Sequence, residues 1–164
     1  FKEVHQMSMS IKKSRLFKLF AVVALAVIMA IGTALPSFAS SDDKGFYFKT
    51  EGGSSNEAFI PARVKQDKTS IYCWIQNSTT KNVTSAKVNA RGGWGTNPDK
   101  DWAVCNSSLG YGRTMQVGTS YFIYNNVKEA GYTYASLSFT SSLASTFRGV
   151  WSPDSVYQSG VAQI

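Results

Sequence analysis

Short runs of apolar residues alternate with clusters of Gly, Asn, Ser and Pro over most of this chain. Period-two alternation of apolar and polar positions recurs in these runs, whereas helical periodicity is hard to find after residue 45, which is typical of β-strands. The runs are residues 46–49, 69–77, 83–91, 102–105, 119–128, 132–140 and 146–151. About seven short strands at this spacing predict an all-β fold, a small antiparallel β-sandwich or barrel.

The run at residues 69–77 predicts a central strand. Ile71 and Ile75 share one face of it, while Tyr72 and Trp74 share the other. Because both faces are apolar, we expect neighbouring structure on both sides of this strand. Residues 51–57, rich in Gly and Ser, and residues 92–99 are expected to be loops.

Two further runs predict which side chains face the core. We expect the apolar members to point inward, namely Ala86, Val88, Ala90, Ala135, Leu137 and Phe139. We expect the residues between them to point outward, namely Lys87, Asn89, Arg91, Tyr134, Ser136 and Ser138. The runs at 119–128 and 132–140 flank a turn that ends at Gly131, so they are expected to pair as a hairpin.

The first 39 residues follow a different pattern. A basic stretch at residues 12–18 precedes a nearly unbroken apolar run at residues 19–35, and a Pro and small residues follow, up to Ala39. This order is typical of a secretory signal peptide, and the apolar run is slightly shorter than the roughly 20 residues of a membrane span. We therefore expect a helical signal peptide that is cleaved after Ala39, in preference to a retained membrane anchor.

Export then sets the domain organisation. Translation is expected to begin at Met7 or Met9, which makes the preceding residues upstream sequence. Residues 40–45 are polar and are expected to form a flexible leader. Residues 46–164 would form a single β domain, secreted from the cell and in contact with a membrane only during export.

Removal of the export signal changes the charge. Of the 17 basic and 10 acidic residues in the chain, five basic and one acidic residue lie in residues 1–39, so the net charge falls from +7 to +3. A nucleic-acid partner calls for a clustered basic stripe and a high domain pI, so we expect none here. The remaining positive charge suits weak attraction to anionic cell-wall polymers.

Two cysteines, Cys73 and Cys105, lie in the exported part. Exported proteins fold in oxidising conditions, so an intramolecular disulfide between the two is expected. Two free thiols and an intermolecular bridge are the alternatives.

Histidine is missing from the exported part, because His5 is the one histidine of the chain. Triads that use imidazole as the base are therefore excluded, and two cysteines cannot complete a structural zinc site. The oxygen-rich residues 97–101 resemble the start of an EF-hand loop, but Trp102 and Ser108 occupy the positions that need Gly and Glu. An irregular calcium site is the less favoured alternative there. We expect no catalytic residues, no metal and no cofactor, and hence no enzyme.

Aromatic residues are the remaining candidates for a binding site. Flat aromatic faces stack on sugar rings, and the polar tips of Tyr and Trp suit a wet surface. Trp94 lies in a Gly-flanked loop, and Tyr132 and Tyr134 lie on a strand face that is otherwise polar. These three residues are the predicted ligand-binding residues, and core packing is the alternative explanation for each of them.

Three stretches together resemble a known group of proteins: residues 67–72, 124–132 and 149–155. The chain resembles the short, signal-bearing, all-β proteins of unknown function from Gram-positive bacteria. The resemblance implies secretion and a bacterial source, and it carries over no catalytic or binding residue.

These observations favour a secreted, non-enzymatic binding or cell-surface-associated module whose partner is a cell-wall polymer or glycan. The alternative is a bacteriocin-like or toxin-like secreted effector, which small size, positive charge and Gly-rich aromatic loops also suit. Binding to cell-surface polymers and killing of related strains separate the two hypotheses.

Overall fold

The computed structural model describes residues 42–106 and 112–164, and this part of the chain contains β-strands and no helix. The strands are β1 (Lys44–Phe59), β2 (Arg63–Val64), β3 (Ile71–Ser78), β4 (Ser85–Gly93), β5 (Ala103–Val104), β6 (Arg113–Gln116), β7 (Ser120–Ile123), β8 (Tyr134–Ser152) and β9 (Ala162–Gln163). The all-β prediction is confirmed, and the described residues hold nine strands where about seven were expected.

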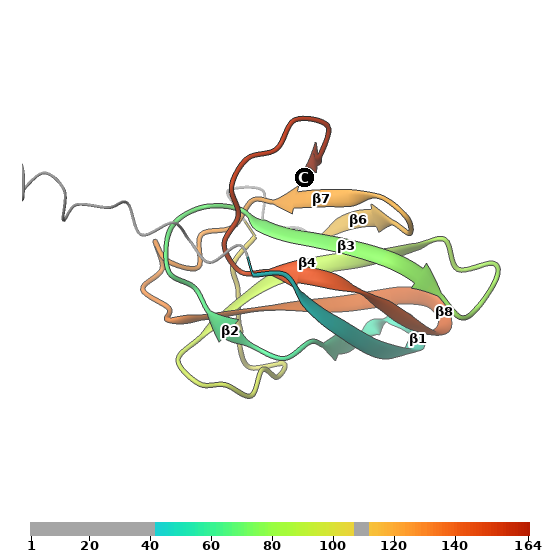
Figure 1. The fold of residues 1–164 in the computed structure, drawn as a ribbon. Coiled ribbons are helices and arrows are strands. Elements are labelled where there is room, and N and C mark those ends of the chain that lie inside the picture. Colours follow the sequence, from blue (N-terminus) through green and yellow to red (C-terminus); the bar gives the residue numbers. More distant parts are fainter. Residues whose placement is uncertain (1–41, 107–111) are drawn as a thin grey trace, which may run out of the picture. The chain divides into compact units, whose positions relative to one another are not determined.

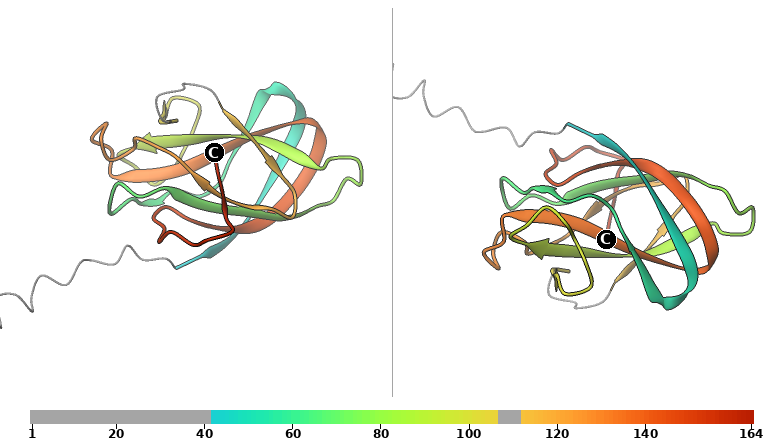
Figure 2. Two further views of the ribbon diagram at one scale, coloured as in Figure 1. Left: turned by 90° about the horizontal axis from the view of Figure 1, so that it is seen from above. Right: turned by 90° about the horizontal axis from the view of Figure 1, so that it is seen from below.

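The long strand β8 organises the fold (Figure 1). Strands β1 and β2 pair antiparallel with one of its edges. The other edge pairs with β4 along the first half of β8, for example Ala90 with Leu137, and with β3 along the second half, for example Trp74 with Val150. Because the two halves of β8 have different neighbours, the single nine-stranded sheet curls, as both views in Figure 2 show.

Stacked aromatic rings fill the inside of this curl. The ring centroids of Phe48 and Phe139 lie 4.2 Å apart and those of Phe48 and Phe147 lie 4.9 Å apart. Phe139 and Phe147 come from the two halves of β8, and Phe48 comes from β1. The stack therefore joins the strands through their inner faces, where burial of apolar surface supplies most of the stabilisation.

Two predictions about individual strands are confirmed. Strand β3 is central, since it pairs with β7 on one side and with β8 on the other. All six residues that were expected to point inward are buried: Ala86, Val88, Ala90, Ala135, Leu137 and Phe139.

The predicted hairpin between residues 119–128 and 132–140 is wrong. Strand β7 pairs with β3 and β9, and its pairing with β9 is parallel. The turn at Gly131, whose φ is +85°, instead sends the chain into β8. Residues 132–140 and 146–151 were expected to be separate strands, but both belong to β8, since no breaker interrupts the chain between them.

Residues 51–57 belong to β1, although a loop was expected there. Gly52 and Gly53 have φ of +79° and +89°, and the register against β8 shifts on both sides of Gly53. The glycines therefore form bulges that let a long strand bend while it continues to pair. Strand β1 also begins at Lys44, inside the segment that was expected to be a flexible leader.

Three residues that were expected to point toward solvent are buried. Ser136, Ser138 and Arg91 are nearly inaccessible, because the chain just after the bulges of β1 covers them. The Ser136 hydroxyl donates to the main-chain oxygen of Ile60 at 2.7 Å, and the Ser138 hydroxyl donates to Glu57 at 3.1 Å. Polar residues on this face of β8 thus satisfy their hydrogen bonds inside the protein.

The expected disulfide is wrong, because Cys73 and Cys105 are both free and buried. Cys73 lies in β3, whereas Cys105 directly follows β5, and β4 and β8 lie between these two strands in the sheet. Burial raises the pKa of both thiols, that of Cys105 to about 11.

The expected signal peptide and its cleavage site after Ala39 lie outside the described residues. Within the described ranges, no helix is long and apolar enough to cross a membrane.

Candidate functional site

Trp94 and Tyr132 form an exposed aromatic pair, here called the aromatic rim. Trp94 is the first residue after β4 and is 72% exposed, and Tyr132 lies two residues before β8. Their ring centroids are 4.8 Å apart with the planes tilted by 56°. Tyr132 is half-buried and packs against the core, so one ring of the pair is anchored and the other stands in water.

The two glycines at the end of β4 make room for this arrangement. A Cβ atom on Gly92 would lie 2.6 Å from the Tyr132 ring, and one on Gly93 would lie 2.6 Å from the Trp102 ring. Neighbouring positions of a strand face opposite sides of the sheet. Aromatic rings therefore cover both faces of the sheet at this end of β4. The sequence Gly-Gly-Trp had indicated only a loop here.

Tyr134 does not belong to the rim. It pairs with Gly93 and points away from the core, whereas the Tyr132 ring lies over Gly92 on the core-facing side. Tyr134 instead lines a hollow of about 330 Å³ together with Arg63, Val64 and other residues. Of the three predicted ligand-binding residues, the structure thus brings two together and places the third on the other face.

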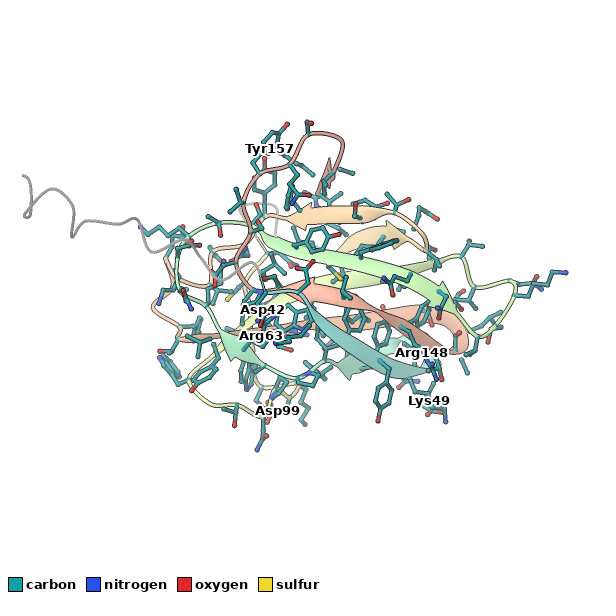
Figure 3. All side chains as sticks on the ribbon, in the orientation of Figure 1. Asp42, Lys49, Arg63, Asp99, Arg148 and Tyr157 are labelled. Carbon is teal, nitrogen blue, oxygen red and sulfur yellow. The ribbon has the colours of Figure 1, made fainter. Side chains whose placement is uncertain are left out.

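A second aromatic cluster was missed by the sequence analysis. The ring of Phe122 in β7 lies 5.9 Å from that of Tyr72 and 6.2 Å from that of Tyr157, which is 70% exposed. Figure 3 shows Tyr157 on the C-terminal segment beyond β8, well away from Asp99 in the loop that follows the rim. Nothing in the local sequence around Tyr157 indicates that this segment returns to β7, so the cluster had no sequence signal.

Glu57 and Asp154 are both engaged in ion pairs. Glu57 forms an ion pair with Arg91, whose guanidinium also donates to the main-chain oxygen of Trp102 at 2.9 Å. Asp154 forms an ion pair with Lys65 at 3.0 Å. In residues 42–106 and 112–164, no group of three or more His, Cys, Asp or Glu side chains could hold a metal ion.

The fold and the site together define a curled all-β domain with an exposed aromatic rim. The model of the family DUF2712, described as proteins of unknown function, matches residues 35–155 of the chain. The chain therefore belongs to this family. The matched range contains all three stretches on which the resemblance to proteins of unknown function was based. No curated protein and no solved structure matches the chain.

Proposed function

We propose that this protein is exported and acts as a non-enzymatic binding module that attaches to a cell-wall polymer or glycan through the aromatic rim. The exposed Trp94 ring, held at a fixed tilt against Tyr132, is the observation that supports the proposal. Half-anchored aromatic rings lose little freedom on binding and offer a flat face to the C–H groups of a sugar ring.

Charge supports a polymer of the opposite sign. The net charge of +3 after residue 39 provides weak, long-range attraction to an anionic surface. Asp99 and Asp101 in the loop beside the rim are exceptions to this positive balance. The rim would therefore recognise the ring of a sugar, while the whole domain contributes the electrostatic attraction.

Co-sedimentation with purified cell walls tests the proposal. The full chain is mixed with insoluble peptidoglycan, with and without its teichoic acid, and the bound fraction is measured. Trp94→Ala is expected to weaken binding by about tenfold, which corresponds to about 1.4 kcal/mol for one central aromatic contact. Tyr47→Ala is the matched control, because Tyr47 on β1 is 75% exposed and lies outside the rim.

Two outcomes contradict the proposal. Equal binding by Trp94→Ala and Tyr47→Ala would remove the rim from recognition. Killing of related strains by a protein that binds none of these surfaces would favour the bacteriocin-like effector instead.

A further inference from the structure

Lys65 and Asp154 form the most deeply buried pair of charged groups among the described residues. Their side chains are 0% and 1% exposed, and Lys65 Nζ lies 3.0 Å from Asp154 Oδ1. The Lys65 ammonium also donates to the main-chain oxygens of Thr69 and Pro153, both at 2.6 Å. These bonds hold the amine in one place against the carboxyl group.

The main chain polarises the carboxyl group of Asp154. The N–H groups of Gln66 and Asp67 both donate to Oδ1 at 3.2 Å, and that of Gln66 also lies 3.0 Å from Oδ2. Two N–H groups aimed at one oxygen stabilise negative charge that develops on it, as in an oxyanion hole. The carboxyl carbon is thereby prepared for attack by a nucleophile.

A second carboxylate completes the cluster. Asp67 Oδ1 lies 3.9 Å from Lys65 Nζ, and the Thr69 N–H donates to the same oxygen at 2.8 Å. Burial raises the pKa of Asp67, but hydrogen bonds with Thr69 and Asp154 outweigh this effect and lower it. The Asp67 carboxylate therefore lies near the Lys65 amine, and its main-chain N–H contacts Asp154, so this residue is placed to carry a proton between them.

Burial also favours the uncharged form of the Lys65 amine. It lowers the pKa of Lys65, although the hydrogen bond and the charge of Asp154 oppose this shift. A dry site penalises an ammonium and a carboxylate, and transfer of one proton removes both charges. The neutral amine and the carboxylic acid that result are the forms that can condense.

We propose that Lys65 and Asp154 condense spontaneously into an intramolecular amide bond after folding. Asp67 first relays a proton from the Lys65 ammonium to the Asp154 carboxylate. The Nζ lone pair then forms a bond to Cγ, and Oδ1 carries the negative charge beside the N–H groups of Gln66 and Asp67. Nζ gives up a second proton through Asp67 to the Oδ2 hydroxyl, and the Cγ–Oδ2 bond breaks to release water.

The step balances without a further reactant. One ammonium and one carboxylate give one amide and one water molecule, and nothing is oxidised or reduced. The amide keeps a single N–H, for the carbonyl of Thr69 or Pro153. The bond would join residues 89 positions apart, from the chain after β2 to the chain after β8. It would provide a covalent cross-link in a domain whose two cysteines are unpaired.

The mass of the intact, denatured full chain tests the proposal. The wild-type protein is expected to be lighter by one water molecule than its sequence requires. Lys65→Arg keeps the charge but replaces the amine with a guanidinium that does not condense, so its mass should equal the calculated value. Asp154→Ala should behave in the same way, and trypsin should fail to cut after Lys65 in the wild-type protein alone.

Two further variants separate the chemistry from a structural effect. Asp154→Asn should lose ammonia in place of water, because the leaving group changes while the attack by Nζ does not. Asp67→Asn should fold but lose water more slowly after refolding from denaturant, which would identify Asp67 as the residue that relays the proton. A merely structural role would change stability and leave the rate of water loss unaltered.

A wild-type protein that keeps its full calculated mass after folding overturns the proposal and leaves Lys65 and Asp154 as an ion pair. Water loss that persists in Lys65→Arg or Asp154→Ala would overturn it as well, because another pair would be responsible. These outcomes are independent of binding by the aromatic rim, so either proposal can fail without the other.

Discussion

Two ion pairs, one made by Glu57 near the end of β1 and one by Lys65 directly after β2, differ in their access to water. The side chains of Lys65 and Asp154 are 0% and 1% exposed, whereas those of Arg91 and Glu57 are 8% and 20% exposed. Because the cost of an unpaired charge rises steeply with burial, the same kind of contact should matter much more in the first pair. The exposure of the side chains to water therefore determines how much each ion pair contributes to the free energy of unfolding.

The two cations also differ in chemistry. The Arg91 guanidinium distributes its charge and donates to Ser138 at 3.0 Å and to the main-chain oxygen of Trp102. The Lys65 amine concentrates its charge on one nitrogen, which becomes a nucleophile once it loses a proton. The Lys65–Asp154 pair can therefore form a covalent bond. The Arg91–Glu57 pair cannot condense in this way, and it serves as the comparison within the same protein.

The largest expected effect is that of Asp154→Ala. Whether the wild-type protein holds the ion pair or the amide, this variant leaves the Lys65 amine buried without its partner, and we expect the free energy of unfolding to fall by at least about 3–5 kcal/mol. Urea denaturation followed by tryptophan fluorescence measures the loss. Asp99→Ala is the control, because Asp99 is an exposed acid in a turn and should change stability by less than about 0.5 kcal/mol.

A loss of less than about 1 kcal/mol in Asp154→Ala would contradict the comparison, because that is the range of solvent-exposed ion pairs. It would mean that water reaches Lys65 as easily as it reaches a surface lysine.

Glu57→Ala should have a smaller effect. It leaves Arg91 without its carboxylate and removes acceptors from Asn89 at 3.1 Å and from Ser138. Since Glu57 is one-fifth exposed, water can replace part of these bonds, and we expect a loss of about 1–3 kcal/mol. Glu57→Gln keeps one acceptor and should fall between the wild-type protein and Glu57→Ala in the same denaturation experiment.

A loss in Glu57→Ala that equals that of Asp154→Ala would break the comparison, since exposure would then not distinguish the two pairs.

The sequence predicted the inner faces of the strands correctly and the outer faces poorly. Alternation of apolar residues is a local pattern, and it placed Leu137 and Phe139 in the core. The serines between them look solvent-exposed locally, but Ser136 is covered by Ile60, which lies 76 positions away in the chain. Tertiary coverage of this kind leaves no mark on the sequence of the strand that it covers.

The candidate site was likewise predictable only where its signal was local in the sequence. Trp94 was identified correctly as exposed, because the flanking glycines indicate a loop at that position. Tyr134 was grouped wrongly with Tyr132, because alternation was extended to a residue that precedes β8. Lys65 carried no signal at all, since a lone lysine after a short apolar run is normally solvated and its partner lies 89 positions away.

The two buried thiols allow a test of desolvation through the pH dependence of stability. Burial raises the pKa of a thiol, whereas it lowers the pKa of Lys65. Burial raises the pKa of Cys105 from 9.0 to about 11 and raises that of Cys73 further. Between pH 9 and about 11, the unfolded chain releases thiol protons that the folded protein keeps, so these groups lose their stabilising contribution as pH rises. Burial instead lowers the pKa of the free Lys65 amine, so in protein that has not formed the amide its contribution rises with pH below 10.5.

The double variant Cys73→Ala with Cys105→Ala isolates the thiol effect. Relative to this variant, the wild-type protein should lose stability as pH rises from 9 to 11 in urea denaturation at fixed ionic strength. Parallel pH profiles for the two proteins would contradict the burial of the thiols. As a check on the correction of the predicted disulfide, the denatured wild-type protein should react with two equivalents of a thiol reagent without prior reduction.

The smallest expected effect on stability is that of Trp94→Ala, at the opposite extreme of exposure from Lys65. Its ring is 72% exposed, so truncation should change the free energy of unfolding by less than about 0.5 kcal/mol. Tyr132→Ala should cost more, about 1–3 kcal/mol, because this ring packs against the core beside Gly92. If both variants lose binding but only Tyr132→Ala loses stability, the rim consists of one anchoring ring and one recognition ring. Equal destabilisation by Trp94→Ala and Tyr132→Ala would show instead that Trp94 is a packing residue. The proposal that the aromatic rim is a binding surface would then be contradicted.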